Sequence, residues 1–318
     1  MSDARYLGVD GGGTKTEFVC IDDAGEVVAR AVTGTTYHLE IGVDEVERRL
    51  DEGISAVCAQ LGIAPAALDQ TFFGLPAYGE DGAVDPELHA ACGRLLGHSR
   101  YTCDNDMVCG WAGSLACEDG INIIAGTGSI GYGERQGLTA RVGGWGEVFG
   151  DEGSAHWIAI QGLALFSRMS DGRVPKGPLH AHVADALDLR SDLELCERVM
   201  GGTGMPRGQV ASLANLVSEA AAAGDAQAHA ILTAAAGELF ALATALRSRL
   251  AFPDDVATPI SWSGGVLLRQ PMIRDELVTL LNRAGGFLCV EPRHSPGYGA
   301  ALYAQKRRMA ATRNDGLG

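Results

Sequence analysis

The sequence predicts an α/β protein made of two duplicated lobes, with a helical insertion in the second lobe. The first observation is a glycine-rich turn between two apolar strands near the start, which returns in altered form in the middle of the chain, so that Gly128 follows Gly13 by 115 residues. The second is the length: 318 residues exceed the usual size of a single core. The third is a hydrophobic content of 46%, which supplies enough apolar side chains for two cores.

The first lobe is expected to contain three strands, a helix, a strand, a helix and a strand. Val46, Leu50 and Ile54 recur at helical spacing, and the Asp22–Gly25 segment has the composition of a turn between strands. In chain order, the elements are expected at residues 5–10, 15–21, 26–32, 44–61, 71–75, 86–96 and 100–103.

The second lobe repeats this order around a long insertion at about 153–251, which is expected to be almost entirely helical. Its repeated elements are expected at residues 121–125, 129–135, 139–142, 260–263, 271–284 and 287–290. We therefore expect a first domain of residues 1–107, completed by a C-terminal helix at 296–318, and a second domain of residues 108–295.

Composition narrows the range of partners. A formal net charge of -15 argues against binding to nucleic acid or to an anionic membrane surface, and no apolar run approaches the ~20 residues that a membrane span needs. The eight cysteines are scattered and no secretory leader is recognisable, which indicates reduced thiols in a cytoplasmic protein. A small-molecule partner is expected.

The glycine turns are typical of phosphate-binding loops. Glycine lets backbone N–H groups gather around an anion without interference from Cβ, and neighbouring hydroxyls add donors. Two further glycines follow the strand at 260–263, where they allow close contact with a base and ribose or simply make a tight connection to a helix. The candidate nucleotide-binding residues are Gly11, Gly12, Gly13, Thr14, Lys15, Gly126, Thr127, Gly128, Ser129, Gly264 and Gly265.

Other interpretations of these turns remain. Gly126, Gly128 and Gly131 also fit the dinucleotide-binding pattern, with Asp151 at the expected distance, but that pattern needs a helix at the turn and the sequence there favours a strand. The first turn lacks the spacing of a P-loop. A plain hairpin turn explains either turn alone, but it does not explain both at matching positions of a repeat.

Two acidic residues follow strands of the first lobe. Asp10 points at the first glycine turn, where a carboxylate would be repelled by phosphate unless a cation lay between them, so it is a candidate Mg²⁺ ligand; a turn aspartate is the alternative. Asp106 is the candidate general base for a substrate hydroxyl, although Asp104 or Asp106 could also cap the following helix.

The segment 143–154 is too rich in glycine for a strand and too aromatic for a linker, so we interpret it as a site-forming loop. Asp151 within it either caps the helix that begins near Ser154 or accepts hydrogen bonds from sugar hydroxyls.

At these motifs the chain resembles the actin, Hsp70 and sugar kinase superfamily, whose lobes have a ribonuclease H-like fold. Within it the chain resembles the N-acetylglucosamine kinases, which share their domain type with the BadF/BadG ATPases. The resemblance implies ATP and Mg²⁺ as cofactors, a homodimer, and phosphoryl transfer to N-acetylglucosamine or glucosamine. It also implies that Asp106 is the general base and that Thr127, Gly144 and Asp151 hold the amino sugar.

The chain departs from the family pattern at two positions. Tyr37 stands where an asparagine that bonds the sugar is usual, and Tyr78 lies in a loop that lacks the usual small polar residue. An ATP-driven switch that activates a partner protein, as in the BadF branch, is the alternative function, but the cysteine motifs of its iron–sulfur members are missing. A sugar-sensing regulator without catalysis is the third possibility.

Overall fold

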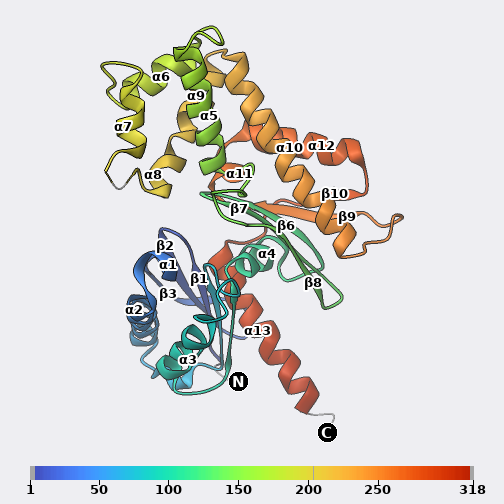
Figure 1. Ribbon diagram of the computed structural model, residues 1–318. Helices are drawn as coiled ribbons and strands as arrows, with labels where there is room; N and C mark the ends of the chain where they lie inside the picture. The colour runs from blue at the N-terminus through green and yellow to red at the C-terminus, as the bar shows by residue number, and fades with distance from the viewer. Residues whose placement is uncertain (1–3, 203, 316–318) are drawn as a thin grey trace. The chain divides into compact units, whose positions relative to one another are not determined.

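The computed structural model describes residues 4–202 and 204–315, which form two compact units (Figure 1). The first unit comprises the residues up to Asp119 together with those from Glu291 onward, and the second comprises Gly120–Val290. The division thus falls after Asp119 rather than after residue 107, because the helix at Met107–Leu115 packs on the C-terminal helix of the first unit.

The first unit is a five-stranded mixed sheet with helices on both faces. Its strands lie in the order β3-β2-β1-β4-β5, in which β1 is antiparallel to β2 and parallel to β4. Its elements are β1 (Tyr6–Gly11), β2 (Lys15–Ile21), β3 (Val27–Gly34), α1 (His38–Ile41), α2 (Val43–Leu61), the short 3-10 helix η1 (Pro65–Ala67), β4 (Gln70–Leu75), α3 (Asp85–Leu96), β5 (Tyr101–Asn105), α4 (Met107–Leu115) and α13 (Pro296–Asp315).

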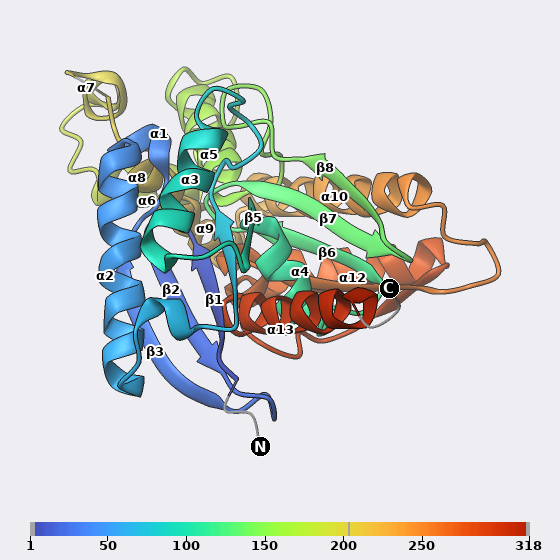
Figure 2. The ribbon, with the colours of Figure 1, turned by 90° about the horizontal axis from the view of Figure 1, so that it is seen from below.

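Neighbouring residues of β4 separate the two faces of this sheet, because side chains alternate along a strand. Phe73 packs in the core under α2 and α3, whereas the Phe72 ring meets Tyr303 of α13 at 4.8 Å. Figure 2 shows α2 and α13 on opposite sides of β1. A Cβ on Gly8 of β1 would overlap the backbone of Ala300 and Ala301, so α13 lies directly against the central strand.

The second unit repeats the same sheet. Its strand order, β8-β7-β6-β9-β10, matches that of the first unit strand for strand and confirms the predicted duplication. Its elements are β6 (Gly120–Ala125), β7 (Ser129–Arg135), β8 (Leu138–Gly143), α5 (Ala155–Ser170), α6 (Pro178–Ala186), α7 (Glu194–Met200), α8 (Arg207–Ser212), α9 (Ala214–Ala222), α10 (Ala226–Arg249), β9 (Thr258–Ser263), α11 (Gly265–Arg269), α12 (Pro271–Ala284) and β10 (Phe287–Cys289).

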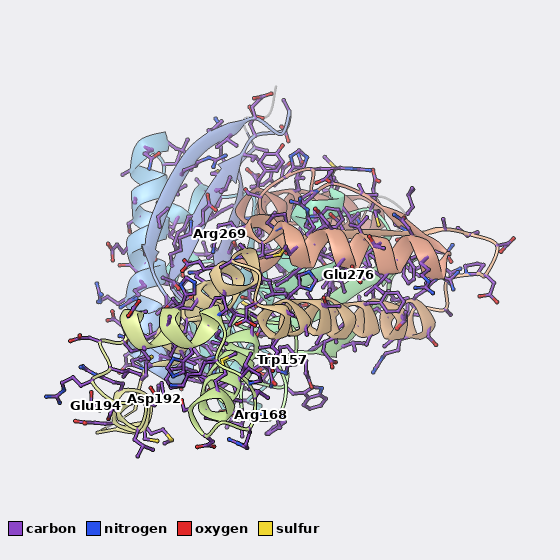
Figure 3. The ribbon with its side chains drawn as sticks, turned by 90° about the horizontal axis from the view of Figure 1, so that it is seen from above. Trp157, Arg168, Asp192, Glu194, Arg269 and Glu276 are labelled. Atoms are coloured by element: carbon purple, nitrogen blue, oxygen red, sulfur yellow. The ribbon has the colours of Figure 1, made fainter. Side chains whose placement is uncertain are left out.

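Helices α5 to α10 form the predicted insertion and extend the core of the second unit. Helix α10 is long and apolar enough by composition to cross a membrane, but Leu232, Leu239 and Leu246 are buried within this core, as in the central helix of a globular domain. On the connection before α7, Asp192, which is labelled in Figure 3, accepts from Lys176 Nζ at 3.0 Å and lies 2.9 Å from His180 Nε2.

Candidate active site

The first glycine turn joins β1 to β2 and stays open on one side. Gly12 N donates to Lys15 O at 2.9 Å, which closes the turn, and Thr35 Oγ1 donates to Gly12 O at 2.8 Å. A Cβ on Gly11 would stand 2.5 Å from Thr36 Oγ1, so packing requires glycine there. No atom lies within 4 Å of a Cβ placed on Gly13. The tip of this turn therefore has room for a ligand.

Asp10 and Asp106 adjoin at one edge of the first sheet. Asp10 pairs with Gly74 of the parallel strand β4, and a Cβ on Gly74 would stand 3.2 Å from Asp106 Cα. Burial raises the pKa of Asp10 to about 8, with the charges of Asp106 and Glu17 as further causes. The strand ends thus bring together two of the predicted residues, as expected for parallel neighbours.

The start of α4 differs from the expectation that Asp104 or Asp106 would cap this helix. Neither aspartate caps α4: Asn105 Oδ1 accepts from Met107 N at 3.2 Å, and Asp104 Oδ1 accepts from Asn105 N at 2.7 Å. Asp106 occupies the N-cap position without a side-chain capping bond. Asn105, between the two aspartates, forms an Asx turn with the first residue of α4.

The chemistry of Asp10 fits a magnesium site of the kind that uses few protein ligands. Mg²⁺ prefers oxygen donors, keeps several waters and is often held by one or two carboxylates together with substrate phosphates. A divalent cation would favour the ionised form of Asp10, which burial and its acidic neighbours disfavour. Among the described residues, no group of three or more His, Cys, Asp and Glu forms a larger metal site.

The second glycine turn, between β6 and β7, is tied to the start of α5. Gly126 N donates to Gly128 O at 2.8 Å, and Gly126 O accepts from Ala155 N at 2.9 Å. Ser129 Oγ donates to Glu152 O at 2.7 Å. The turn and the loop that precedes α5 therefore form one packed structure.

The Gly264–Gly265 connection lies beside this second turn. Gly264 has a φ of +89° and no room for a side chain against the Ala125 backbone, and a Cβ on Gly126 would stand 3.8 Å from Gly265 N. The guanidinium of Arg269, labelled in Figure 3, covers Gly265. All the predicted nucleotide-binding residues of the second lobe are therefore neighbours within one unit.

Asp151 in the 143–154 loop is not a helix cap. Ser154 caps α5, its Oγ accepting from Trp157 N at 3.1 Å, whereas the Asp151 carboxylate accepts from Arg207 Nη2 at 2.5 Å. Asp151 is buried and has a φ of +57°. Sequence reasoning did not find Arg207, because it lies 56 residues away in the insertion and belongs to no motif.

The same loop carries three exposed apolar side chains and several glycines with a positive φ. Gly144 has a φ of +68°, and its carbonyl accepts from Arg141 Nη2 at 2.5 Å. Trp145, Val148 and Phe149 are each at least 72% exposed, unlike most large apolar residues of the unit. The loop is thus fixed at its Arg141 and Asp151 ends and presents apolar surface between them.

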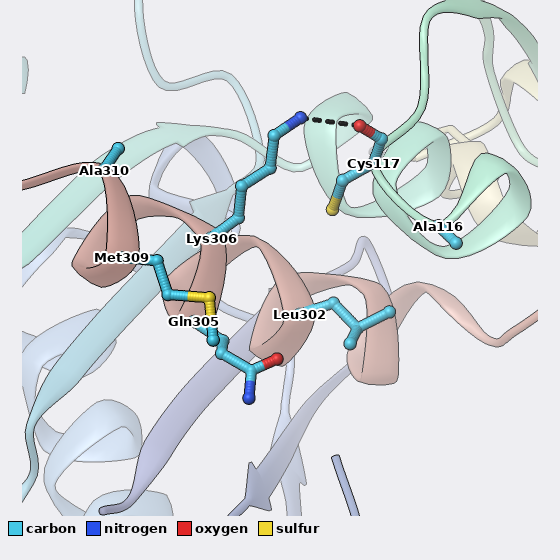
Figure 4. Close-up of a pocket in the computed structure, with 7 residues that line it drawn as sticks. All are labelled: Ala116, Cys117, Leu302, Gln305, Lys306, Met309 and Ala310. Atoms are coloured by element: carbon cyan, nitrogen blue, oxygen red, sulfur yellow. Dashed lines mark hydrogen bonds between the residues drawn. The ribbon is translucent and has the colours of Figure 1, made fainter. Parts of the chain in front are cut away.

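A separate hollow of about 430 Å³ lies in the first unit along α13 (Figure 4). Lys306 Nζ donates to Cys117 O at 2.6 Å at its edge. None of the predicted site residues lines this hollow, so we assign it no part in the candidate site.

Comparisons with known proteins agree on one family. The chain matches the BadF/BadG/BcrA/BcrD ATPase family over residues 7–304. It is 31% identical to the N-acetylmuramic acid/N-acetylglucosamine kinase of Clostridium acetobutylicum over 87% of this chain and 90% of the relative. It is 29% identical to the N-acetyl-D-glucosamine kinase of Dictyostelium discoideum over 96% of this chain and 98% of the relative.

A similar solved structure is that of a Chromobacterium violaceum protein assigned provisionally as an N-acetylglucosamine kinase. It superposes with a TM-score of 0.75 at 27% identity and covers 96% of this chain and all of its own. The predicted two-lobe fold is confirmed by this likeness and by the repeated sheets.

Proposed function

The chain belongs to the BadF/BadG/BcrA/BcrD ATPase family, and from this premise we propose that it is an ATP-dependent kinase that phosphorylates a hydroxyl of an amino sugar, N-acetylglucosamine or glucosamine. The observation that carries the proposal is the alignment with named amino sugar kinases along nearly their whole length. The open first turn and the carboxylate pair beside it supply the chemistry that such a reaction needs.

In this proposal the two glycine turns are phosphate-binding loops for ATP. Residues Gly11 to Lys15 and Gly126 to Ser129 provide backbone donors and hydroxyls, and Gly264 and Gly265 bind the adenosine. Exclusion of water from the reacting groups matters, because water would otherwise compete with the sugar as the nucleophile.

Asp106 acts as the base in this scheme: it orients the sugar hydroxyl and takes its proton as the oxygen attacks the γ-phosphorus. Asp10 holds Mg²⁺ or its water ligands. Magnesium, when bound, neutralises charge on the phosphate oxygens. Thr127, Gly144 and Asp151 hold the sugar, and Asp151 accepts hydrogen bonds from sugar hydroxyls.

Tyr37 and Tyr78 bear on which amino sugar is used. Tyr37 N donates to Thr35 Oγ1 at 3.0 Å, beside the first turn, whereas the Tyr78 hydroxyl lies 3.3 Å from His89 Nδ1 of α3. The Tyr78 carbonyl accepts from Asn105 Nδ2 at 3.3 Å, next to Asp106, so we expect both tyrosines to lie near the sugar. We further propose that the kinase works in the cytoplasm as a homodimer, as family resemblance and the scattered free cysteines favour.

A coupled assay for ADP release tests the proposal. The panel is glucosamine, N-acetylglucosamine, N-acetylmannosamine, N-acetylmuramate and glucose, with mapping of the phosphorylated position in each product. Release of ADP that depends on an amino sugar is expected. Slow ATP hydrolysis without any dependence on sugar would instead favour the ATPase switch, for which the family match is the supporting observation. Sugar binding without turnover would favour a regulator.

A further inference from the structure

We propose that Arg207, in the helical insertion, positions Asp151 for the sugar, so that sugar binding depends on a residue outside the duplicated lobes. The inference rests on the proposed function and deepens it. Arg207 is a positioning residue in this scheme: it acts through the Asp151 carboxylate and does not itself touch the sugar.

The ion pair is short and shielded from water. Arg207 Nη2 donates to Asp151 Oδ2 at 2.5 Å, and Arg207 Nε lies 3.2 Å from Glu147 Oε2. The Asp151 side chain is 4% exposed, whereas that of Arg207 is 27% exposed. One guanidinium thus connects two carboxylates of the same loop.

The guanidinium is the cationic partner of the buried Asp151 carboxylate. Burying a carboxylate costs free energy unless a cation lies beside it. A carboxylate held in such a pair presents its oxygens as hydrogen-bond acceptors, and hydroxyl groups are suitable donors to them. Arg207 binds at Oδ2, and a carboxylate has acceptor capacity beyond that one bond.

The backbone around the pair holds it in one arrangement. Asp151 has a φ of +57°, a conformation that few residues other than glycine adopt without support, and its carbonyl accepts from Ser154 N at 3.1 Å. Arg207 begins α8, which is anchored on α5 through the buried side chains of Val210 and Ala211. Asp151 and Arg207 are therefore both fixed to the same helix, one at its start and one through α8.

The pair also borders the second glycine turn. A Cβ on Gly128 would stand 2.7 Å from Arg207 Nη2 and 2.8 Å from Asp151 Oδ2. A side chain at this position would displace the guanidinium or the carboxylate. The sugar-binding acid and the phosphate turn are thus packed against each other through the ion pair.

The test compares Arg207→Gln with wild type in steady-state kinetics over both substrates. The matched control is Arg190→Gln, which removes an arginine from an exposed ion pair with Glu194 in the same insertion. We expect Arg207→Gln to raise the KM for the amino sugar by about 10- to 100-fold, with the KM for ATP little changed. Arg207→Lys keeps the charge but not the planar fork, and is expected to recover part of the loss.

A double variant separates positioning from direct contact. If Arg207 acts through Asp151, Arg207→Gln in an Asp151→Asn background adds no further rise in sugar KM. Additive effects, or an unchanged sugar KM in Arg207→Gln, would overturn the inference while leaving the kinase proposal standing. A wild-type chain without amino sugar-dependent ADP release would overturn both. If Arg207→Gln does not fold, the Arg207→Lys variant decides: wild-type sugar KM and kcat overturn the inference.

Discussion

The two glycine turns occupy equivalent places in two equivalent sheets, yet their surroundings differ. The first turn is open at Gly13 and lies beside Asp10, whose near neighbours Asp106 and Glu17 share its charge sign. The second is packed against the start of α5 and against Asp151, whose neighbour is a guanidinium. The insertion accounts for the difference, because it is present only in the second lobe and supplies Arg207.

This contrast shows that two equivalent turns of a duplicated fold have opposite charges beside them. Asp10 is crowded by acids and suits a cation that arrives with the nucleotide. Asp151 is paired with a cation from its own chain and suits a neutral, hydroxyl-rich partner. The two sheets have the same strand order, but the charges beside their glycine turns differ.

The largest expected effect concerns Asp106, one of the acidic residues beside the first glycine turn. Asp106→Asn keeps the shape of the side chain but cannot take a proton, so turnover should fall by about 10²- to 10⁴-fold with the ATP affinity nearly intact. Measurement of kcat together with a nucleotide-binding titration checks this. Near-normal turnover in the variant would remove Asp106 from the catalytic role.

The next effect compares an open turn with a packed one. Gly128→Ala places a methyl group against the Arg207–Asp151 pair and should lower the free energy of unfolding by about 1–3 kcal/mol. Gly13→Ala places the same methyl group in open space and should change the free energy of unfolding by less than about 1 kcal/mol. Urea unfolding of both variants measures the difference, and equal destabilisation would contradict the contrast.

A third expected effect is a pH dependence that originates at Asp10. Its pKa is raised from 3.8 to about 8 in the folded protein, so between these values the folded state holds a proton that the unfolded state has lost. The free energy of unfolding should therefore fall as pH rises across this window in metal-free, nucleotide-free protein. Asp10→Asn should flatten the profile; an identical slope in wild type and variant would exclude Asp10 as its origin.

The smallest expected effect has the opposite sign and belongs to the second lobe. Burial lowers the pKa of His156 below 6.5; Arg207 acts in the same direction, and Glu147 and Asp151 oppose it. The folded state thus binds fewer protons than the unfolded state, so the stabilising contribution is complete above pH 6.5 and declines as pH falls below it. In thermal unfolding scans, the His156→Gln variant should lose less stability than wild type as the pH falls below 6.5. An equal loss in both proteins would assign the pH dependence to other groups.

Much of the fold could be predicted from the sequence because the hydrophobic periods are clear. The expected helix at 44–61 is α2, at Val43–Leu61, and the strand at 129–135 is found with the same bounds. The sequence placed Asp10 and Asp106 each at the end of a strand, and the structure shows that these two strand ends lie at one edge of the sheet.

The errors arose where several polar residues compete for one role. Asp151 was a reasonable helix cap, but Ser154 lies next to the first helical residue and takes the bond. Likewise Asn105, between two aspartates, accepts the hydrogen bond from Met107 N at the start of α4. Arg207 could not have been found, because its pairing with Asp151 depends on how the insertion folds. Sequence patterns predict hydrogen bonds between residues that are close in the chain. Contacts between residues far apart in the chain are found only from the packed structure.

The place of α13 has a consequence for how the protein is made. This helix follows the whole second lobe in the chain, yet it covers β1 closely enough that Gly8 has no room for a methyl group. During synthesis the nascent first lobe must wait, with one face of its sheet bare, until the whole second lobe has left the ribosome. The first unit begins to emerge before the second but is completed after it, because it needs α13. We expect it to depend most on a chaperone in the time before α13 is made.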